Sequence, residues 1–299
     1  MVYLVSLVVD GLLSGAVYGL MAMGLVVTYK ASRAVNFAFG EWMTLGAILA
    51  AGAASVMPWG GSWLGLAAAL FVGWIGMQAL TAGFARTILA ARGEKTVLVT
   101  IMLTLGLGIF LRGAMDLVFA GVPRSLSLPF GEASLAIGPV TLAGGKLTAA
   151  VLGLAGLAAI GWFYKRSRTG IALRAMADDR RAAEAVGIDA RRYLAIAWGL
   201  GGSVALVTGV LWMALTSGGF GLALLGLKIL PVLMLGGMDS VGGTLVAALL
   251  VGVLESVTAG YLDPVLGSGL GSLVPNILLI LIMLVRPTGL FGEARAVRL

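Results

Sequence analysis

Long apolar runs with few charged residues follow one another along this chain, separated by short connections. A run of roughly 18 or more such residues is long enough to cross the hydrocarbon core of a bilayer as a helix. Nine runs are candidates, and the seventh and ninth are short enough to be tilted helices, half-helices or re-entrant segments. In order, the runs are Leu4–Thr28, Val35–Met57, Trp63–Phe84, Val97–Phe119, Leu147–Tyr164, Leu194–Thr216, Leu222–Leu235, Val241–Ala259 and Leu273–Val285. The sequence therefore predicts an all-α polytopic membrane protein with about eight or nine transmembrane or half-membrane helices.

The composition supports a helix bundle that lies in the membrane along most of its length. Hydrophobic residues make up 60% of the chain, charged residues make up 11%, and there are 46 glycines. Glycine weakens helices in water, but in lipid it lets neighbouring helices approach closely. The formal net charge of +7 would also fit a nucleic-acid-binding protein. The basic residues lie between the apolar runs, however, so membrane topology explains them and no nucleic-acid partner is expected.

Cysteine and histidine are both absent from the sequence. Their absence excludes disulfides, thiolate or imidazole metal ligands, and nucleophile–base pairs that use either residue. Carboxylate chemistry remains open, but the sequence predicts no catalytic residue and no metal site. The first apolar run, Val2–Tyr29, is too long for the core of a signal peptide and has no basic region before it. We therefore expect it to be a retained span.

Basic residues between the runs predict which ends of the helices face the cytoplasm, because cytoplasmic loops carry an excess of lysine and arginine. The marking residues are Lys30, Arg33, Arg86, Arg92, Lys95, the basic residues between 165 and 192, Arg286, Arg295 and Arg298. They require an external N-terminus, an internal C-terminus and an odd number of crossings. If one short run does not cross, eight crossings remain and the side of the N-terminus stays open. Residues 120–146, with Pro123, Pro129 and Pro139, are expected to form the largest external loop, with little regular structure.

One long polar segment, residues 165–193, interrupts the apolar pattern. Its charged residues are Lys165, Arg166, Arg168, Arg174, Asp178, Asp179, Arg180, Arg181, Glu184, Asp189, Arg191 and Arg192. Between Ile171 and Val186 apolar residues recur every three or four positions, which predicts a short amphipathic helix broken at the turn that holds the two adjacent aspartates. Gly187 follows where a helix would stop. We expect this cytoplasmic loop to be bound by another protein.

In the first run, Gly11, Gly15 and Gly19 are four residues apart, with Ser14 beside them. This spacing places them on one face of a helix, where a neighbouring backbone can pack closely. The pattern predicts helix packing and says nothing about a substrate.

The second run opens with Asn36, Phe37, Ala38, Phe39, Gly40 and Glu41. Asn36 can cap the first turn of the helix, and the carboxylate of Glu41 suits the positive end of the helix dipole. Alternatively these polar groups line a water-filled path, because charged groups in lipid are costly. Both interpretations can hold together.

Other polar residues within the apolar runs are open to more than one interpretation. Arg112 and Asp116 are four residues apart and can pair with each other on one helix. Lys228 could extend to the membrane interface or face a pore. A glycine-rich stretch between Leu235 and Gly243, which contains Asp239, interrupts two apolar runs. It predicts either a tight hairpin at the cytoplasmic face or non-helical backbone beside a polar cavity. Glu255 lies midway along a run and is a candidate for a path or for locking helices together.

Five short motifs occur in the same order, and at compatible spacing, as in a known protein family. They are Gly11-Leu-Leu-Ser-Gly15-Ala-Val-Tyr-Gly19-Leu, Val35-Asn-Phe-Ala-Phe-Gly-Glu41, Arg174-Ala-Met-Ala-Asp-Asp179 with Ala182-Ala183 and Gly187-Ile188, Gly236-Gly-Met-Asp-Ser-Val-Gly-Gly243, and Arg286-Pro-Thr-Gly-Leu-Phe-Gly292. Over nearly its whole length the chain resembles the permease subunits of branched-chain amino-acid ABC transporters, the LivH type. Many members carry histidine or another polar residue where Phe39 stands. If that position touches substrate, the preference here has moved toward apolar or aromatic ligands; a packing or lipid-facing role is the alternative.

The resemblance implies a single transmembrane permease domain over residues 1–299, in a bacterial or archaeal inner membrane. In such permeases a cytoplasmic helix docks on the ATP-binding subunit, and the matching residues here are Arg174, Asp178, Asp179, Ala183, Glu184, Gly187 and Ile188. The path is expected along the second and eighth runs, at Asn36, Phe39, Gly40, Glu41, Asp239 and Glu255. The implied partners are a second related permease, two ATP-binding subunits, an external or periplasmic substrate-binding protein and membrane lipids.

No cofactor is expected in this chain. Lys146 follows two glycines but lacks the P-loop spacing, and Leu147 stands where a hydroxyl residue is required. ATP and Mg²⁺ would therefore bind to partner ATPases, and the chain itself would not be an enzyme. The substrate implied by the resemblance is leucine, isoleucine or valine; urea, short amides and aromatic acids are alternatives.

Two other classes stay open at this point. An ion-coupled secondary transporter could use Glu41, Asp239 or Glu255 as a proton or sodium site and would work without an ATPase. A membrane-embedded enzyme is disfavoured because histidine and cysteine are absent.

Overall fold

The computed structural model describes most of the chain, with short gaps. The described residues are 1–56, 62–89, 97–122, 126, 134–137, 140–216, 221–238, 240–267, 269–286 and 289–292. Several residues singled out above lie outside them: Arg92, Lys95, Pro123, Pro129, Pro139, Asp239, Arg295 and Arg298.

Helices account for nearly all of the described structure. They are α1 (Val2–Ser32), α2 (Phe39–Val56), α3 (Trp63–Phe84) with a π-helical turn (Ala85–Leu89), α4 (Val97–Val118), α5 (Gly144–Arg166), α6 (Arg168–Asp178), α7 (Arg180–Ala185), α8 (Ala190–Thr216), α9 (Gly221–Gly236), α10 (Val241–Tyr261), α11 (Asp263–Leu266) and α12 (Leu270–Val285). Seven helices in the described ranges are long and apolar enough to cross a membrane: α1, α2, α3, α4, α5, α8 and α10. The all-helical membrane class is confirmed. The two runs predicted to be short are α9 and α12, with 16 residues each.

The loop between α4 and α5 differs from its prediction. Its described part contains a two-stranded antiparallel hairpin, β1 (Ser134–Ile137) and β2 (Val140–Ala143). The expectation of little regular structure is wrong for these residues. Ile137 is paired with Val140 next to the turn, and isoleucine and valine are residue types that favour strands. The second strand leads directly into α5, which begins three residues before the predicted Leu147.

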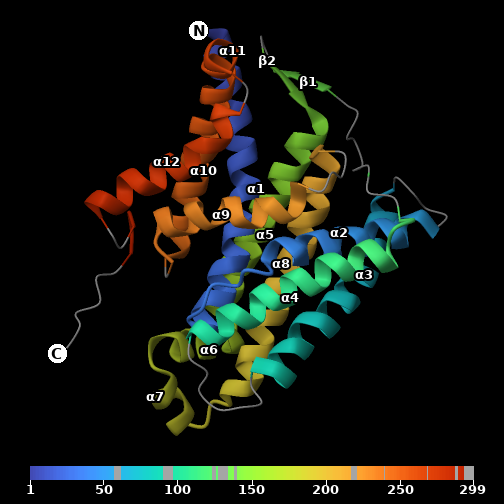
Figure 1. Ribbon diagram of the computed structural model, residues 1–299, viewed down its shortest axis with the longest axis vertical. Coiled ribbons are helices and arrows are strands. Elements are labelled where there is room, and N and C mark those ends of the chain that lie inside the picture. Colours follow the sequence, from blue (N-terminus) through green and yellow to red (C-terminus); the bar gives the residue numbers. More distant parts are fainter. Residues whose placement is uncertain are drawn as a thin grey trace.

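The first helix packs lengthwise against α10 through the glycine stripe (Figure 1). A Cβ on Gly11 would lie 2.5 Å from the Cα of Val253, and one on Gly15 would lie 2.8 Å from the Cα of Leu249. A side chain at either position would overlap the backbone of α10. On Gly19 a Cβ would meet side chains and no backbone among its nearest neighbours, the closest being Leu245 at 3.2 Å. The helices therefore approach most closely toward the N-terminal part of α1.

The second helix is enclosed by the bundle, although its first turn is polar. It contacts α3, α4, α8 and α9. Trp42 of α2 and Trp198 of α8 are fully buried and meet edge to face, with ring centroids 5.4 Å apart. Aromatic pairs in this geometry stabilise a core beyond the area that they bury. The core of the molecule therefore lies where α2, α8 and α1 meet.

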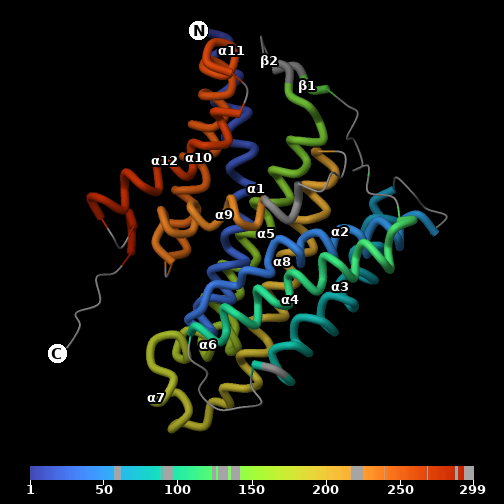
Figure 2. Tube along the Cα trace, viewed as in Figure 1, coloured from blue at the N-terminus to red at the C-terminus, as the bar shows by residue number. Residues whose placement is uncertain are grey.

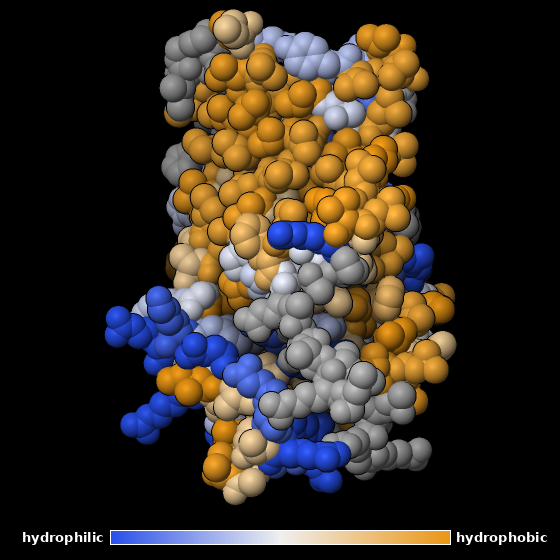
Figure 3. Space-filling model, turned by 90° about the vertical axis from the view of Figure 1, so that its left-hand side faces the viewer, coloured by the Kyte–Doolittle hydropathy of each residue, from blue (hydrophilic) through white to orange (hydrophobic). Residues whose placement is uncertain are grey.

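The two ends of the molecule differ in character. In Figures 1 and 2 the N-terminus, α11 and the β-hairpin lie at one end, and α6 and α7 lie at the other. Figure 3 shows apolar residues over most of the face formed by α10 and α12, and hydrophilic residues toward the end that carries α6 and α7. We call that end the basic end, because Lys30, Arg33, Arg180 and Arg191 meet there. An apolar flank between two polar ends is what a bilayer requires.

Residues 289–292 pack against the non-helical connection between α9 and α10. The N–H of Leu290 donates to the carbonyl of Leu235 (2.8 Å). Gly237 has a φ of +93°, which favours glycine, and it packs against the backbone of Gly292. A Cβ on Gly237 would lie 2.6 Å from the backbone nitrogen of Gly292. The hydroxyl of Ser240 accepts from the N–H of Gly243 (3.0 Å) and so caps α10. Leu235 and Gly237 are therefore held against residues 289–292, and packing against protein is one setting in which non-helical backbone is tolerated near a membrane.

Candidate functional site

The polar segment between α5 and α8 forms two helices, where the sequence predicted one helix with an interruption. Asp179 is the C-cap residue of α6 and also the N-cap residue of α7. Its carboxylate accepts hydrogen bonds from the N–H groups of Arg181 (2.9 Å) and Ala182 (3.1 Å). An aspartate in this role satisfies the free N–H groups of a helix start and favours a new helix over continuation of the old one.

This segment is fastened to the bundle on several sides. Arg33 ends α1 in a left-handed conformation (φ 54°), and its guanidinium donates to the carbonyl of Ala177 in α6. A Cβ on Gly170 would overlap the backbone at Phe163 and Tyr164, so α6 folds tightly back on α5. The segment therefore cannot shift without moving the helices that hold it.

The residues expected to contact an ATP-binding partner differ in how exposed they are to solvent. Arg174, Asp178, Asp179, Glu184 and Gly187 are exposed, Ile188 is half-buried, and Ala183 is buried. Ala183 packs with Met176 and Ala190, and its carbonyl accepts from the N–H of Ile188 (3.1 Å). The buried alanine therefore holds the turn together, while the exposed charged groups are the ones available for contact.

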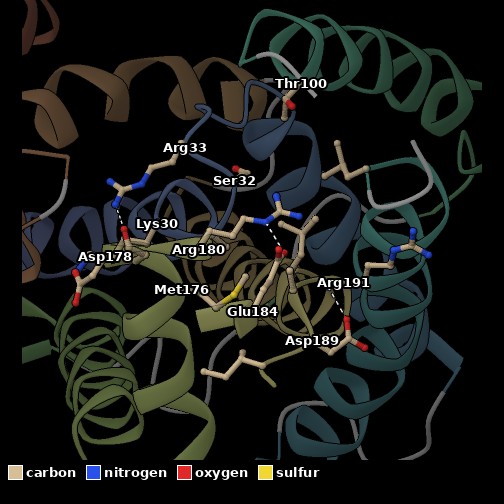
Figure 4. Close-up of a pocket in the computed structure, with 16 residues that line it drawn as sticks. Lys30, Ser32, Arg33, Thr100, Met176, Asp178, Arg180, Glu184, Asp189 and Arg191 are labelled. Carbon is tan, nitrogen blue, oxygen red and sulfur yellow. Dashed lines mark hydrogen bonds and ion pairs between the residues drawn. The ribbon is translucent and has the colours of Figure 1, made fainter. Parts of the chain in front are cut away.

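A cavity of about 600 Å³ lies between the end of α1, the α6–α7 segment and the start of α8. Figure 4 shows Arg33 reaching toward α6, and Arg180 and Glu184 pointing toward one another. The guanidinium Nε of Arg180 lies 2.9 Å from Oε1 of Glu184. Both side chains are nearly half exposed, so this pair stabilises the segment only weakly.

The polar residues at the start of α2 follow a short connection of bends and turns that leads from the end of α1. Asn36 is buried, and its Oδ1 accepts from the N–H of Ala38 (3.0 Å), one residue before the helix begins. Its Nδ2 has no hydrogen-bond partner among the described residues. Phe39 is buried against the position of Gly24 in α1, and Gly40 faces Gly226 of α9. Phe39 thus lies in the core, as the packing interpretation requires.

Glu41, in the first turn of α2, pairs with Arg112 of α4. The Nη2 of Arg112 donates to Oε1 of Glu41 at 2.6 Å. The sequence suggested a pair within α4 between Arg112 and Asp116, and this missed the partner on α2. No local pattern points to it, because the two residues are 71 positions apart.

Another ion pair joins α9 to α10. The ammonium of Lys228 pairs with the carboxylate of Glu255, and both side chains are 19% exposed. The hydroxyl of Tyr18 in α1 donates to the same carboxylate (3.0 Å). Lys228, for which the sequence left two roles open, therefore has an internal partner. Glu255 lies in a junction of three helices, α1, α9 and α10.

A further ion pair, Lys146 with Asp10 at 2.5 Å, lies near the β-hairpin. Within the described ranges, no group of three or more Asp, Glu, His or Cys residues is placed to hold a metal ion. Of the six path candidates, four gather at the start of α2, Glu255 lies with Lys228, and Asp239 is outside the described residues.

Comparison with known proteins decides the family. Residues 7–283 match the family described as "Branched-chain amino acid transport system / permease component". This chain belongs to that family. It is therefore a multi-pass membrane permease, and not the ATP-hydrolysing component of such a system.

Individual relatives cover nearly the same length. The chain is 28% identical to the "High-affinity branched-chain amino acid transport system permease protein LivH" of Salmonella typhimurium, over 97% of this chain and 96% of that protein. It is 30% identical to the corresponding protein BraD of Pseudomonas aeruginosa, over 95% and 94%. Among solved structures, "PsaBC from Streptococcus pneumoniae in complex with Fab" is 19% identical over 94% of this chain and 92% of that chain, with a TM-score of 0.48. That TM-score is too low to establish a shared fold.

Proposed function

We propose that this permease imports branched-chain amino acids as one part of an ATP-driven complex. The ligand follows the names of LivH and BraD, whose whole lengths the chain nearly covers. A second related permease, two ATP-binding subunits and an external substrate-binding protein would complete the complex. Residues 1–299 would act as one transmembrane domain, because α1 packs against α10, and α9 contacts both α10 and α2. Urea, short amides and aromatic acids remain alternative ligands.

The observation that carries this proposal is the α6–α7 segment. It presents Asp178, Arg174 and Glu184 outward while its other side is fastened to α1, α5 and α8. By the positive-inside rule the basic end faces the cytoplasm, where ATP-binding subunits work. A rigid, charged projection there is suited to receive their motion, and ATP and Mg²⁺ would stay on those subunits.

Motion of this segment would reach the proposed path through the helices that hold it. Arg33 links α6 to the end of α1, and a short connection of bends and turns leads from Arg33 to the first turn of α2. A shift at α6 would therefore move Asn36 and Glu41. Two discrete arrangements of this unit would open the path to one side of the membrane at a time.

Charge reversal at one exposed aspartate tests the coupling contact. Asp178→Arg should lower ATP-dependent uptake and the amount of co-purifying ATPase about tenfold, the effect of losing roughly 1.4 kcal/mol of binding free energy. Asp178 is the better position, because Asp179 also caps α7. Asp178→Asn is the matched variant at the same exposed position, because it removes the charge without reversing it and should lower uptake less than Asp178→Arg. The amount of each variant in the membrane checks folding. Unchanged uptake and ATPase recovery in Asp178→Arg would place Asp178 outside the contact.

A further inference from the structure

The cavity at the basic end lies where three of the candidate spans have one end. Lys30 and Arg33, at the end of α1, form part of its wall. Thr100 lines it from the start of α4, and Leu194 lines it from near the start of α8. Because spans end where the hydrocarbon core meets the lipid headgroups, a cavity between such ends is within reach of a lipid phosphate. By the positive-inside rule these lipids belong to the cytoplasmic leaflet.

The charged side chains that line this cavity leave one positive charge in excess. The basic ones are Lys30, Arg33, Arg180 and Arg191, and the acidic ones are Asp178, Glu184 and Asp189. Two of the three carboxylates are already bonded within the polar segment. Glu184 pairs with Arg180 at 2.9 Å, and Asp189 accepts from the backbone N–H of Arg191 at 2.9 Å. A ligand with one negative charge would therefore balance the cavity.

The remaining wall is largely apolar. Leu89, Met176, Ile188 and Leu194 line it from the π-helical turn, α6, the α7–α8 connection and α8. In Figure 4 the basic side chains of α1 lie on one side of the Arg180–Glu184 pair, and Arg191 lies on the other. The volume of about 600 Å³ is in the range of sites that hold an organic ligand. Basic and apolar groups together suit a phosphate that is joined to a glycerol and acyl chains.

We propose that this cavity binds the headgroup of an anionic phospholipid from the cytoplasmic leaflet. The phosphate diester supplies the single negative charge that the lining groups lack, and the glycerol end of the lipid contacts the apolar wall. Basic pockets between spans on the cytoplasmic side are the setting in which membrane proteins hold such headgroups. Asn36 and Glu41 do not line this cavity, so the site is separate from the path proposed at the start of α2.

A headgroup in this position would stabilise the surface proposed to contact the ATP-binding subunits. It would lie between the end of α1 and the α6–α7 segment, which bound the cavity on two sides. The importer should therefore need anionic lipid for full coupling. This consequence rests on the proposed function, whereas binding of the lipid does not.

Lipid binding is tested on the purified full-length permease by thermal unfolding with three additives. They are a short-chain phosphatidylglycerol, a phosphatidylcholine with the same acyl chains, and inorganic phosphate. A ligand that binds only the folded protein raises its melting temperature. We expect phosphatidylglycerol to raise it and the other two to leave it unchanged. An equal rise with phosphatidylcholine or with inorganic phosphate would overturn the assignment of an anionic lipid, and so would no rise at all.

Variants locate the binding in the cavity. Lys30→Gln combined with Arg191→Gln should weaken the apparent affinity for phosphatidylglycerol about tenfold or more. Arg192→Gln is the matched control, because Arg192 is the exposed neighbour of Arg191 and does not line the cavity, and it should keep the wild-type affinity. Unchanged affinity in the double variant would overturn the proposal. If the double variant does not fold, Arg191→Gln alone decides in the same way, with an expected loss of about fivefold.

Uptake by the complete importer, with its binding protein, separates this inference from the proposed function. ATP-dependent leucine uptake should be several-fold faster in phosphatidylglycerol-containing vesicles than in vesicles of phosphatidylcholine alone, and the double variant should lose the difference. Equal uptake by the wild-type importer in both kinds of vesicle would overturn the stabilising role of the lipid. Intact lipid binding with no ATP-dependent leucine uptake in either kind of vesicle would contradict the proposed function and leave the lipid site standing.

Discussion

Lys228 and Glu255 show how much a single residue depends on a partner from another helix. Each is a lone charge within an apolar helix, yet together with the hydroxyl of Tyr18 they satisfy one another. Removing one member leaves an uncompensated charge, which costs roughly 3–5 kcal/mol when the site is buried. Removing both members can be nearly neutral.

We therefore expect Lys228→Met to lower the melting temperature of the purified permease markedly, and Lys228→Met combined with Glu255→Gln to restore most of the loss. Thermal unfolding in detergent, followed by the intrinsic fluorescence of tryptophan, measures both. If the double variant were no more stable than Lys228→Met, the two residues would not form an energetically coupled pair.

The sequence could not predict such pairs, although it predicted the local features of the same residues. The helix start that places Glu41 in a first turn is readable from neighbouring positions, and so is the stripe of Gly11 and Gly15. Arg112 with Glu41, or Lys228 with Glu255, are contacts between helices that come together only through the fold. For Arg112 a nearby aspartate supplied a plausible local partner, and the distant one was missed.

At the scale of helices, the apolar runs predicted the positions of all nine candidate spans to within a few residues, because the bilayer fixes both length and composition. The polar connections were harder to predict. The split into α6 and α7 depends on the side chain of Asp179 bonding back to the backbone. The β-hairpin depends on pairing between its two strands. The apolar runs that predict spans and the three-to-four-residue spacing that predicts helices do not report such pairing.

Helix packing gives a prediction with an internal control, since glycines occur both with and without close neighbours. Gly11→Ala should push α1 away from α10 and cost about 1–3 kcal/mol, because the new methyl group would meet backbone. Gly106→Ala in α4 meets nothing within 4 Å and should not destabilise the protein. Comparing the two melting temperatures checks this. Equal values would mean that the α1–α10 contact is looser than described.

At the scale of the whole molecule, the proposed assembly predicts which proteins accompany the permease, and the exposed charged residues of the α6–α7 segment are available to them. The tagged permease, extracted in mild detergent from its native membrane, should bring down two P-loop ATPases and a second permease in stoichiometric amounts. Mass spectrometry of the eluate measures this. Recovery of the permease alone, in a form that still transports leucine in ATP-free vesicles, would favour an ion-coupled mechanism and contradict the role given to α6 and α7.

The close contact between α1 and α10 has a consequence for how the protein is made. The ribosome finishes α1 at Ser32 but does not begin α10 until Val241, so at 5–20 residues per second the glycine face of α1 waits on the order of ten seconds or more for its partner. During that interval the face is open to any other newly inserted helix. A chain truncated before Val241 would leave the glycine face of α1 without its partner, so we expect it to be degraded in the membrane faster than the full-length chain.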